Sequence, residues 1–326
     1  MIFNLNNISK NSAVYKAYIR LANNLAKDQP VFFEKYSTSI RSADFVICAN
    51  IWHVLFTWFY LLGSKAKIIF WVQGVIAEES YLKHNSKFRF YLLKLLEKIC
   101  LYFSDAYIYV SPYMMEFYSK NKSVRNKPAL IFPCISDLRH NPEIKRDSNN
   151  YCYIGGMSKW QNFEKIIKIM NLVVSLNQQA KFSIATNDLS VCRDKIDCLA
   201  SDQLKKVISL VSLSSKQEIE DFLSKAAYGF LIRDDIVVNN VASPIKLAEY
   251  FSCGVNVIST KGVTSYVNLI KQAGFIIDEK NIESLKTVNL KCDEKAALKV
   301  FKENFNENCL SDSIDLFFKE IGLLKQ

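Results

Sequence analysis

Short apolar runs alternate along the chain with longer segments whose apolar residues recur every three or four positions. The apolar runs predict buried strands at residues 1–6, 31–33, 43–49, 67–71, 105–111, 129–133, 151–154, 181–186, 207–213, 228–232, 255–259 and 274–278. The longer spacing predicts helices at residues 12–26, 52–59, 81–103, 163–176, 217–226 and 311–324. Strands that alternate with helices predict right-handed βαβ units, and therefore an α/β protein with parallel sheets.

Residues 137–150 interrupt this pattern, because they are polar and have no apolar periodicity. Such a stretch is typical of a linker between domains. The chain has 326 residues, which is enough for two domains of ordinary size. We therefore expect an N-terminal domain at 1–140 and a C-terminal domain at 141–326.

Residues 241–260 predict a loop, a helix, a tight turn and a strand in succession. Ser243 is a favourable N-cap residue, and Pro244 suits the first helical position. Gly254 is expected to end the helix. The apolar residues of the helix share one face and should be buried; they are Ile245, Leu247, Ala248 and Phe251.

The polar residues of the same helix predict an anion site. Lys246 is expected to be a free lysine in the first turn, where the exposed amides of a helix attract a phosphate. Glu249 lies about one turn deeper, where it would accept hydrogen bonds from a ribose diol. The alternative is an ordinary amphipathic helix whose Lys246 and Glu249 are solvated.

Two further places in the second half suggest contact with a ligand. Gly155 and Gly156 follow the strand predicted at 151–154, and a double glycine lets the backbone approach a ligand closely. The alternative is that they form only a turn. Arg233 follows the strand at 228–232, where a guanidinium would meet a pyrophosphate as a fork of donors. The alternative is a surface arginine paired with Asp234 or Asp235.

The formal net charge of +10 is consistent with nucleic acid, an anionic membrane or a phosphate-bearing substrate. No nucleic-acid-binding motif is present, so we expect no nucleic acid partner. The helix at 81–103 has an apolar face with interleaved basic residues, which is typical of contact with an anionic membrane surface. The alternative is a surface helix packed on its own sheet.

The cysteines help to predict the compartment. Nine are present, no CxxC occurs, and most have apolar neighbours, so we expect reduced thiols in a cytoplasmic protein. No signal peptide is expected at the N-terminus. The longest apolar run, 51–63, is shorter than the roughly 20 residues that a membrane span needs. No His/Cys cluster has metal-ligand spacing, so neither a metal nor another cofactor is expected.

The pattern of the 241–260 stretch resembles the nucleotide-binding signature of retaining glycosyltransferases of the family 4 type, which have the GT-B fold. The matching residues are Pro244, Lys246, Glu249, Tyr250, Gly254, Val257 and Ile258. Within that family the chain resembles bacterial capsule and lipopolysaccharide enzymes. The resemblance implies two Rossmann-like domains that face each other across a cleft, with a C-terminal helix that often crosses back to the first domain.

The resemblance also implies roles for individual residues. Arg233, Lys246 and Glu249 would be the catalytic group, with Glu249 on the ribose and the two cations on the diphosphate. The remaining donor-binding residues would be Gly155, Gly156, Lys159, Ser243, Pro244 and Asn240. A Gly followed by Glu-Glu faces the acceptor in that family, so the acceptor-side candidates are Gln73, Gly74 and Glu79.

Three family charges are missing from this chain. Val241 stands where the first of two glutamates, seven residues apart, is expected. Gly156 and Gln161 replace an arginine and a lysine that contact the donor phosphates in the family. These departures bear on donor identity and on catalysis itself, since the first glutamate usually lies near the donor sugar in that family.

The sequence thus predicts a metal-independent glycosyltransferase that moves a sugar, with retention, from a UDP- or GDP-linked donor. The acceptor would be a surface polysaccharide or a lipid-linked glycan, and the protein would be cytoplasmic or peripheral on the inner membrane face. One alternative is a non-catalytic sugar-nucleotide-binding protein or partner subunit of a polysaccharide-assembly system. Another is a basic membrane-surface protein that does not respond to nucleotides.

Overall fold

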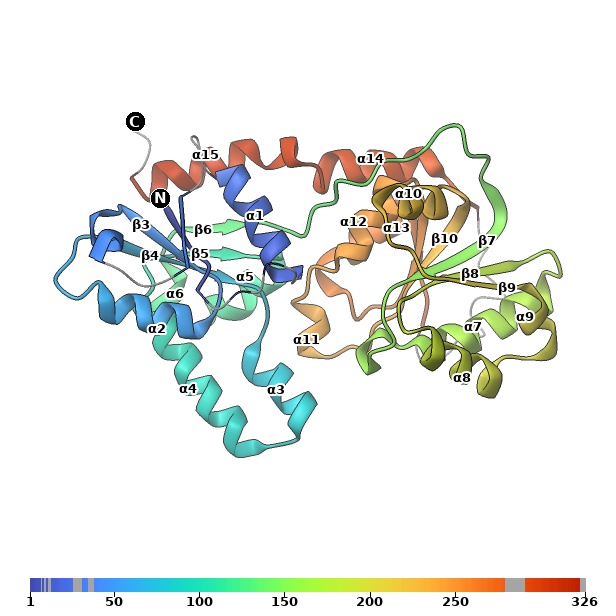
Figure 1. The fold of residues 1–326 in the computed structure, drawn as a ribbon, viewed down its shortest axis with the longest axis horizontal. Coiled ribbons are helices and arrows are strands. Elements are labelled where there is room, and N and C mark those ends of the chain that lie inside the picture. The colour runs from blue at the N-terminus through green and yellow to red at the C-terminus, as the bar shows by residue number, and fades with distance from the viewer. Residues whose placement is uncertain are drawn as a thin grey trace. The chain divides into compact units, whose positions relative to one another are not determined.

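The computed structural model describes residues 1–322 apart from residues 7, 9, 11, 12, 26–30, 35–37 and 279–290. The chain forms two compact units, which Figure 1 shows as a ribbon. Unit 1 contains Met1–Cys134, Val241–Ser243 and the chain from Leu310 onward, and unit 2 contains Ile135–Asn240 and Pro244–Cys309. The sequence predicted the boundary between the domains after residue 140, whereas in the structure unit 2 begins at Ile135.

The sheet of unit 1 is six-stranded and wholly parallel, in the order β2-β1-β3-β4-β5-β6. Its strands are β1 (Ile2–Asn4), β2 (Val31–Phe33), β3 (Phe45–Cys48), β4 (Lys67–Val72), β5 (Ala106–Tyr109) and β6 (Ala129–Ile131). Its helices include α1 (Ala13–Leu25), α2 (Ile51–Tyr60), α3 (Ile76–His84), α4 (Lys87–Phe103), α5 (Pro112–Ser119), α6 (Lys122–Arg125) and α15 (Ser311–Glu320). Helix α15 packs against β6.

The sheet of unit 2 is also six-stranded and parallel, in the order β12-β11-β10-β7-β8-β9. Its strands are β7 (Asp147–Ile154), β8 (Lys181–Ala185), β9 (Ile208–Val211), β10 (Ala226–Leu231), β11 (Asn256–Ser259) and β12 (Gly274–Ile276). Its helices include α7 (Phe163–Leu176), α8 (Leu189–Leu199), α9 (Asp202–Val207), α10 (Lys216–Ser224), α11 (Val237–Asn240), α12 (Ile245–Ser252), α13 (Val267–Gln272) and α14 (Glu294–Asn304). Two parallel sheets with helices confirm the predicted α/β class.

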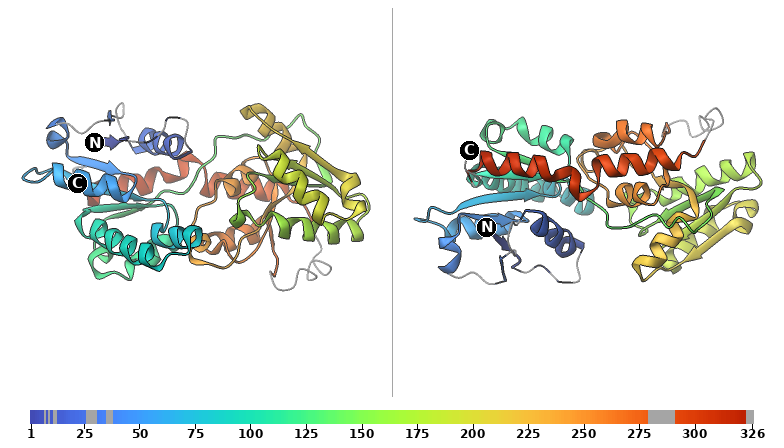
Figure 2. Two further views of the ribbon diagram at one scale, coloured as in Figure 1. Left: turned by 60° about the horizontal axis from the view of Figure 1, so that its bottom comes forward. Right: turned by 90° about the horizontal axis from the view of Figure 1, so that it is seen from above.

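The core of unit 2 lies on both faces of its sheet. Tyr151 and Tyr153 of β7 belong to a cluster with the apolar residues of α7. Cys152, between them, belongs to a second cluster with α12, α13 and α14. Successive residues of a strand point to opposite faces, so α7 covers one face and α12 the other (Figure 2).

The helix predicted at 81–103 is two helices, α3 and α4. Asn85 follows α3 in the left-handed region, with φ of +49°. Ser86 then caps α4, and its side chain accepts a hydrogen bond from the Arg89 backbone at 3.4 Å. The apolar periodicity continues through this break and therefore gives no sign of it. The break itself is possible because asparagine adopts the left-handed region at little cost. The single-helix prediction was therefore wrong.

The polar stretch 137–150 is also not a free linker. The Arg139 amide donates to Glu220 at 2.8 Å, and the Asn141 amide donates to Ser224 at 3.0 Å, so α10 holds this stretch. Its last four residues begin β7 rather than precede it. Helices α6, α8, α9, α11 and α14 were not predicted. The predicted ends of the first helix, residues 12 and 26, and of the last, residue 324, lie outside the described residues.

Among the residues that the structure describes, no helix combines the length and the apolar character that crossing a bilayer requires.

Candidate functional site

Helix α12 begins one residue later than predicted. Its residue Tyr250 packs the helix against strand β10. Pro244, with ψ of 118°, is the N-cap, and the Ser243 hydroxyl instead accepts a hydrogen bond from the Cys134 amide at 2.9 Å, so the predicted capping role of Ser243 was wrong. Gly254 follows the helix with φ of +73°, which confirms the predicted stop. The Tyr250 ring fills the space that a side chain at Gly229 of β10 would need.

Lys246 is buried, and not free as the sequence suggested. Its side chain is only 8% exposed, and Nζ donates to Gln161 Oε1 at 2.7 Å and to the Tyr153 hydroxyl at 3.2 Å. The ammonium also lies 4.3 Å from the centre of the Tyr153 ring. Burial, helped by the nearby charge of Arg233, lowers the pKa of Lys246 to about 7. The solvated-lysine alternative therefore does not hold.

The double glycine lies directly against this lysine. Gly155 follows β7 with φ of +139°, and a Cβ there would lie 2.3 Å from Lys246 Nζ. The Gly156 carbonyl accepts a hydrogen bond from the Tyr153 hydroxyl at 2.6 Å. Tyr153 thus contacts both the loop and the lysine, so the loop is more than a connecting turn.

Arg233 is a second buried cation at the same edge of the sheet. Strands β7 and β10 are parallel neighbours, so Gly155 and Arg233, which follow them, lie at the same carboxyl edge. The Arg233 side chain is 8% exposed, and Nη1 donates to the Trp160 carbonyl at 2.8 Å. Burial lowers the pKa of Arg233, and its charge in turn lowers that of Lys246.

The alternative of a surface arginine paired with an aspartate does not fit this environment. Asp234 forms its ion pair with Lys165. Asp235 accepts a hydrogen bond from Asn240 Nδ2 at 2.8 Å. Because Arg233 and Lys246 are like charges in a buried place, an anion bound between them and the glycine loop would relieve their mutual repulsion.

Of the remaining donor-side candidates, Glu249 acts on this pair through its charge. Glu249 is half-buried on α12, and its charge raises the pKa of Lys246, against the larger effect of burial. The Asn240 Oδ1 atom is buried and has no hydrogen-bond partner within the described residues. Lys159 is exposed in the short 3-10 helix Lys159–Gln161.

Two residues of this site were not anticipated as parts of it. Gln161 was interpreted only as a lost charge, yet it is the nearest acceptor of the Lys246 proton. Tyr153 was hidden in an apolar strand pattern. Its place two residues before the double glycine, at the end of a buried strand, is the only signal in the sequence that could have indicated it.

The acceptor-side candidates come together in unit 1. Gln73 and Gly74 follow β4, and Gln73 Nε2 donates to the Ala49 carbonyl, which follows the neighbouring strand β3, at 3.3 Å. The Glu79 carboxylate reaches back over Gly74, where a Cβ would lie 2.1 Å from Oε1. The Gly74 carbonyl accepts a hydrogen bond from the Tyr118 hydroxyl at 3.3 Å. Glu79 also lies in the first turn of α3, as expected of a helix start.

A buried polar cluster lies behind these residues. Glu97 of α4 is 4% exposed and accepts hydrogen bonds from Tyr118 at 2.6 Å and from Lys94 at 3.2 Å. Lys94 also pairs with Glu78 at 2.7 Å. Ser111 caps α5, and its side chain accepts a hydrogen bond from the Met114 amide at 3.1 Å.

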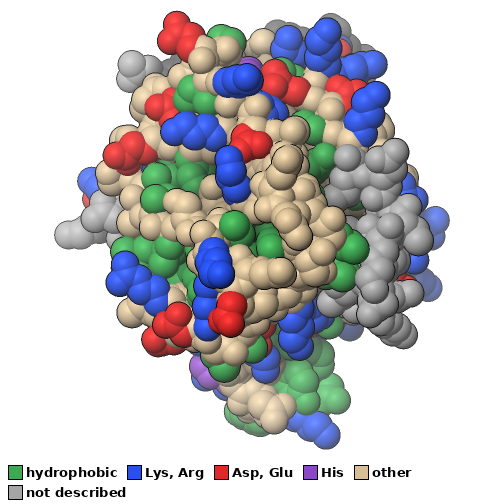
Figure 3. Space-filling model, turned by 90° about the vertical axis from the view of Figure 1, so that its right-hand side faces the viewer, with side chains coloured by type: hydrophobic (Ala, Val, Ile, Leu, Met, Phe, Trp, Pro, Cys, Tyr) green, Lys and Arg blue, Asp and Glu red, His purple; other side chains and the backbone are tan. Residues whose placement is uncertain are grey.

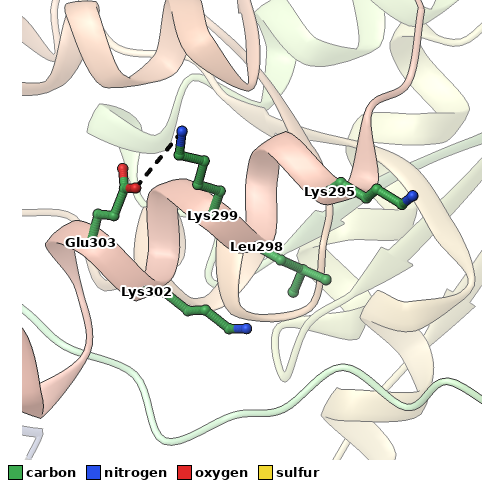
Figure 4. Close-up of a pocket in the computed structure, with 5 residues that line it drawn as sticks. All are labelled: Lys295, Leu298, Lys299, Lys302 and Glu303. Carbon is green, nitrogen blue, oxygen red and sulfur yellow. Dashed lines mark ion pairs between the residues drawn. The ribbon is translucent and has the colours of Figure 1, made fainter.

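Within the described ranges, no group of three His, Cys, Asp or Glu side chains could hold a metal ion. One hollow lies on the outer side of α14, lined by Lys295, Leu298, Lys299, Lys302 and Glu303 (Figure 4). Its residues all come from one helix, and Lys299 pairs with Glu303 at 3.9 Å. None of the predicted site residues lines it.

No family model matches the chain, and no curated protein matches it. Several solved structures share its fold. HepE from Anabaena, in complex with UDP and glucose, superposes with a TM-score of 0.69 at 10% identity, over 98% of this chain and 98% of that one. Sucrose-phosphate synthase from Thermosynechococcus elongatus gives 0.63 at 13% identity, over 86% and 74%.

The pneumococcal O-GlcNAc transferase GtfA, in complex with UDP and GlcNAc, gives a TM-score of 0.61 at 12% identity, over 86% of this chain. The chain spans 56% of that protein and 57% of GtfA in the GtfA/B complex. These likenesses establish the fold, which is the GT-B architecture of two parallel-sheet units.

Proposed function

We propose that this protein is a glycosyltransferase that uses a nucleoside-diphosphate sugar, with UDP or GDP as the leaving group. The observation that carries the proposal is the pair of buried cations, Lys246 and Arg233, beside the side-chain-free Gly155 at the carboxyl edge of a parallel sheet. Ligands of such sheets bind at this edge. The fold shared with HepE, whose structure contains UDP and glucose, supports the proposal.

In this proposal the diphosphate binds against Lys246, Arg233 and the glycine loop. The anion raises the pKa of Lys246 from about 7, so that the bound lysine is fully charged. Nζ then exchanges Gln161 for a phosphate oxygen. Cations and amides that face the leaving oxygen stabilise the charge that grows there, and each such donor contributes about 2–4 kcal/mol to transition-state stabilisation.

The rest of the donor has candidate partners among other residues of unit 2. Glu249 would accept the ribose hydroxyls. The unsatisfied Oδ1 of Asn240 would accept a hydrogen bond from the sugar, in place of the glutamate that Val241 replaces. Val241 is 1% exposed, and its carbonyl accepts a hydrogen bond from Ser111 at 2.6 Å, so its side chain belongs to a core.

We further propose that transfer proceeds with retention and without a metal, as in the family that the 241–260 stretch resembles. The two buried cations would neutralise the diphosphate. Gln73, Gly74 and Glu79 would contact the acceptor, which we propose to be a surface polysaccharide or a lipid-linked glycan. The proximity of Glu79 and Gly74 supports their assignment to one subsite.

A second candidate is a sugar-nucleotide-binding protein without turnover. The observation that favours it is the buried, apolar Val241 at the position of a family carboxylate. This candidate keeps the nucleotide site and loses only the chemistry. Consumption of a UDP- or GDP-sugar, with release of the nucleoside diphosphate, distinguishes the two.

The test is thermal unfolding with UDP, GDP, CMP or no ligand. A nucleotide at about 100 times its dissociation constant stabilises by about 2.7 kcal/mol. We expect UDP or GDP to raise the unfolding midpoint of the wild type. The increase should be absent in Lys246→Met and reduced in Glu249→Ala.

The matched control is Lys299→Met, which removes an exposed lysine from α14. This variant should respond to the nucleotide as the wild type does. A folded wild-type protein that responds to none of the three nucleotides would contradict the proposal.

A further inference from the structure

Helix α4 has its most apolar stripe on the outside. Its exposed large side chains are Phe88 (77%), Tyr91 (68%), Leu92 (45%), Leu95 (56%) and Tyr102 (63%). We call these five residues the α4 stripe. Their spacing of three, one, three and seven residues places them on one side of a helix with 3.6 residues per turn. A surface helix normally turns such a stripe toward the core, so α4 is inverted.

The residues on the inward side of α4 explain why the helix has this rotation about its axis. Glu97, on the side opposite the stripe, is buried and bound by Tyr118 and Lys94. Cys100 and Leu101 are buried on the same inward side. A buried carboxylate that lost these partners would cost several kcal/mol, so the polar cluster fixes the rotation of the helix.

Helix α2, which packs against α4, also exposes aromatic residues. Trp52, Phe56 and Phe59 recur at spacings of four and three, and each is more than half exposed. Trp58 stacks on Phe103 at 4.1 Å between ring centroids, which joins the two helices. Most large hydrophobic side chains that the structure exposes lie between residues 52 and 102.

The exposed charged residues of α2 and α4 themselves are all basic. Helix α2 has no charged residue, and the only acidic residue of α4 is the buried Glu97. Lys87 and Lys98 flank the α4 stripe on one side and Arg89 flanks it on the other, by the same helical geometry. All three are exposed. In Figure 3 the lowest part of the molecule, formed by α3 and α4, shows hydrophobic side chains beside Lys or Arg side chains.

We propose that the α4 stripe, with the adjoining aromatic residues of α2, docks unit 1 on an anionic phospholipid bilayer. Aromatic and leucine side chains would enter the boundary between headgroups and acyl chains, and the flanking cations would meet lipid phosphates. A protein partner fits less well, because lysine is depleted at the centre of protein interfaces. A second copy of the chain would bring two positive rims together.

The docking stands on residues of unit 1 alone and does not depend on the proposed function. It would serve that function by bringing a lipid-linked acceptor to unit 1. Tyr118 connects the two features, because its hydroxyl contacts both Glu97 of α4 and the Gly74 carbonyl of the acceptor-side candidates. The membrane-bound helix and that subsite are therefore joined by one side chain.

The test is co-sedimentation of the full chain with vesicles of phosphatidylglycerol and phosphatidylcholine, compared with phosphatidylcholine alone. We expect binding to the anionic vesicles only, weakened by added salt. Phe88→Ser with Leu95→Ser should weaken binding about ten-fold or more. The matched control is Leu176→Ser on α7, because Leu176 is 57% exposed and Leu95 is 56% exposed; it should bind as the wild type does.

Charge is tested separately by Lys87→Gln and Lys98→Gln, each of which should weaken binding roughly five-fold. The control is Lys299→Gln on α14, which should have no effect. Equal binding by the stripe variant and the Leu176 control would overturn the proposal. So would a dimer in solution that Leu95→Ser converts to a monomer, because a second copy would then cover the stripe.

The nucleotide response of the same variants keeps this proposal separate from the first. An intact response in the stripe variant shows that unit 2 is folded, and an unchanged unfolding transition of unit 1 shows that only docking has changed. Wild-type protein that binds anionic vesicles and ignores nucleotides would support the membrane face and contradict the proposed function.

Discussion

Lys246 shows most clearly what a single residue gains from its folded surroundings. The sequence indicated it as a candidate but described it as a free lysine at the start of the helix. The structure buries it between Tyr153, Gln161 and Arg233, which come from three other segments of unit 2. Spacing along one helix predicts on which face of the helix a residue lies. It does not predict which side chains, distant in the sequence, surround the terminal group of that residue.

This burial makes stability depend on pH in a direction that can be tested. The pKa of Lys246 is about 7 in the folded chain, below the 10.5 of an ordinary lysine, so the unfolded state binds more protons between these values. Stability therefore rises with pH across that window, by at most about 1.4 kcal/mol per pH unit from this one group. In Lys246→Met this contribution should be lost.

The measurement is the urea midpoint of both proteins from about pH 7 to pH 9, compared as a difference. The difference removes the opposite effect of buried tyrosines and cysteines, such as Tyr153 and Cys152, whose raised pKa values lower stability at alkaline pH. Parallel curves for the two proteins would mean that Lys246 is fully charged in the folded state.

At the scale of elements, strands were predicted better than helix ends. All twelve predicted strands are present, because an apolar run that is buried on both faces is visible in the sequence itself. The start of β7 was missed because Asp147 and Asn149 are polar and lie where the strand emerges, with Asp147 paired to Lys181 at 2.8 Å. The break between α3 and α4 depends on the single residue Asn85. The apolar periodicity of the sequence does not indicate such a break.

That break gives a sharp prediction for Asn85, whose φ is +49°. Asn85→Gly should leave stability nearly unchanged, since glycine adopts this conformation freely. Asn85→Ala should cost about 1 kcal/mol, because its Cβ is strained in the left-handed region. Chemical denaturation of the two variants measures the difference. If alanine were as stable as glycine, α3 and α4 would be joined as one helix.

At the scale of the whole molecule, the division into two parallel-sheet units followed from the alternation of strands and helices. The exact division did not follow from this alternation, because the C-terminal helix belongs to unit 1 although it follows unit 2 in sequence, an arrangement that only the family resemblance implied. No local pattern distinguishes a helix that packs on its own unit from one that packs elsewhere. Ile314, Phe317 and Phe318 of α15 are nonetheless buried.

These buried residues predict that the two units respond separately to core mutations. Phe317→Ala, in unit 1, should cost about 3–5 kcal/mol and lower an unfolding transition that a bound nucleotide does not protect. Phe305→Ala, in the α12–α14 cluster of unit 2, should cost a similar amount and lower the protected transition. Calorimetry with and without nucleotide separates the two. A single transition lowered equally by both variants would mean that the units unfold together.

The three residues Val241–Ser243 have a consequence for dissecting the protein. They belong to unit 1, where Val241 and Ser243 bind Ser111 and Cys134, although the chain on both sides of them belongs to unit 2. Unit 1 is therefore assembled from three separate stretches of chain, and no contiguous fragment reproduces it. A gene cut at the middle would encode two incomplete pieces, so complementation between co-expressed fragments, rather than truncation, is the way to study either unit apart from the other.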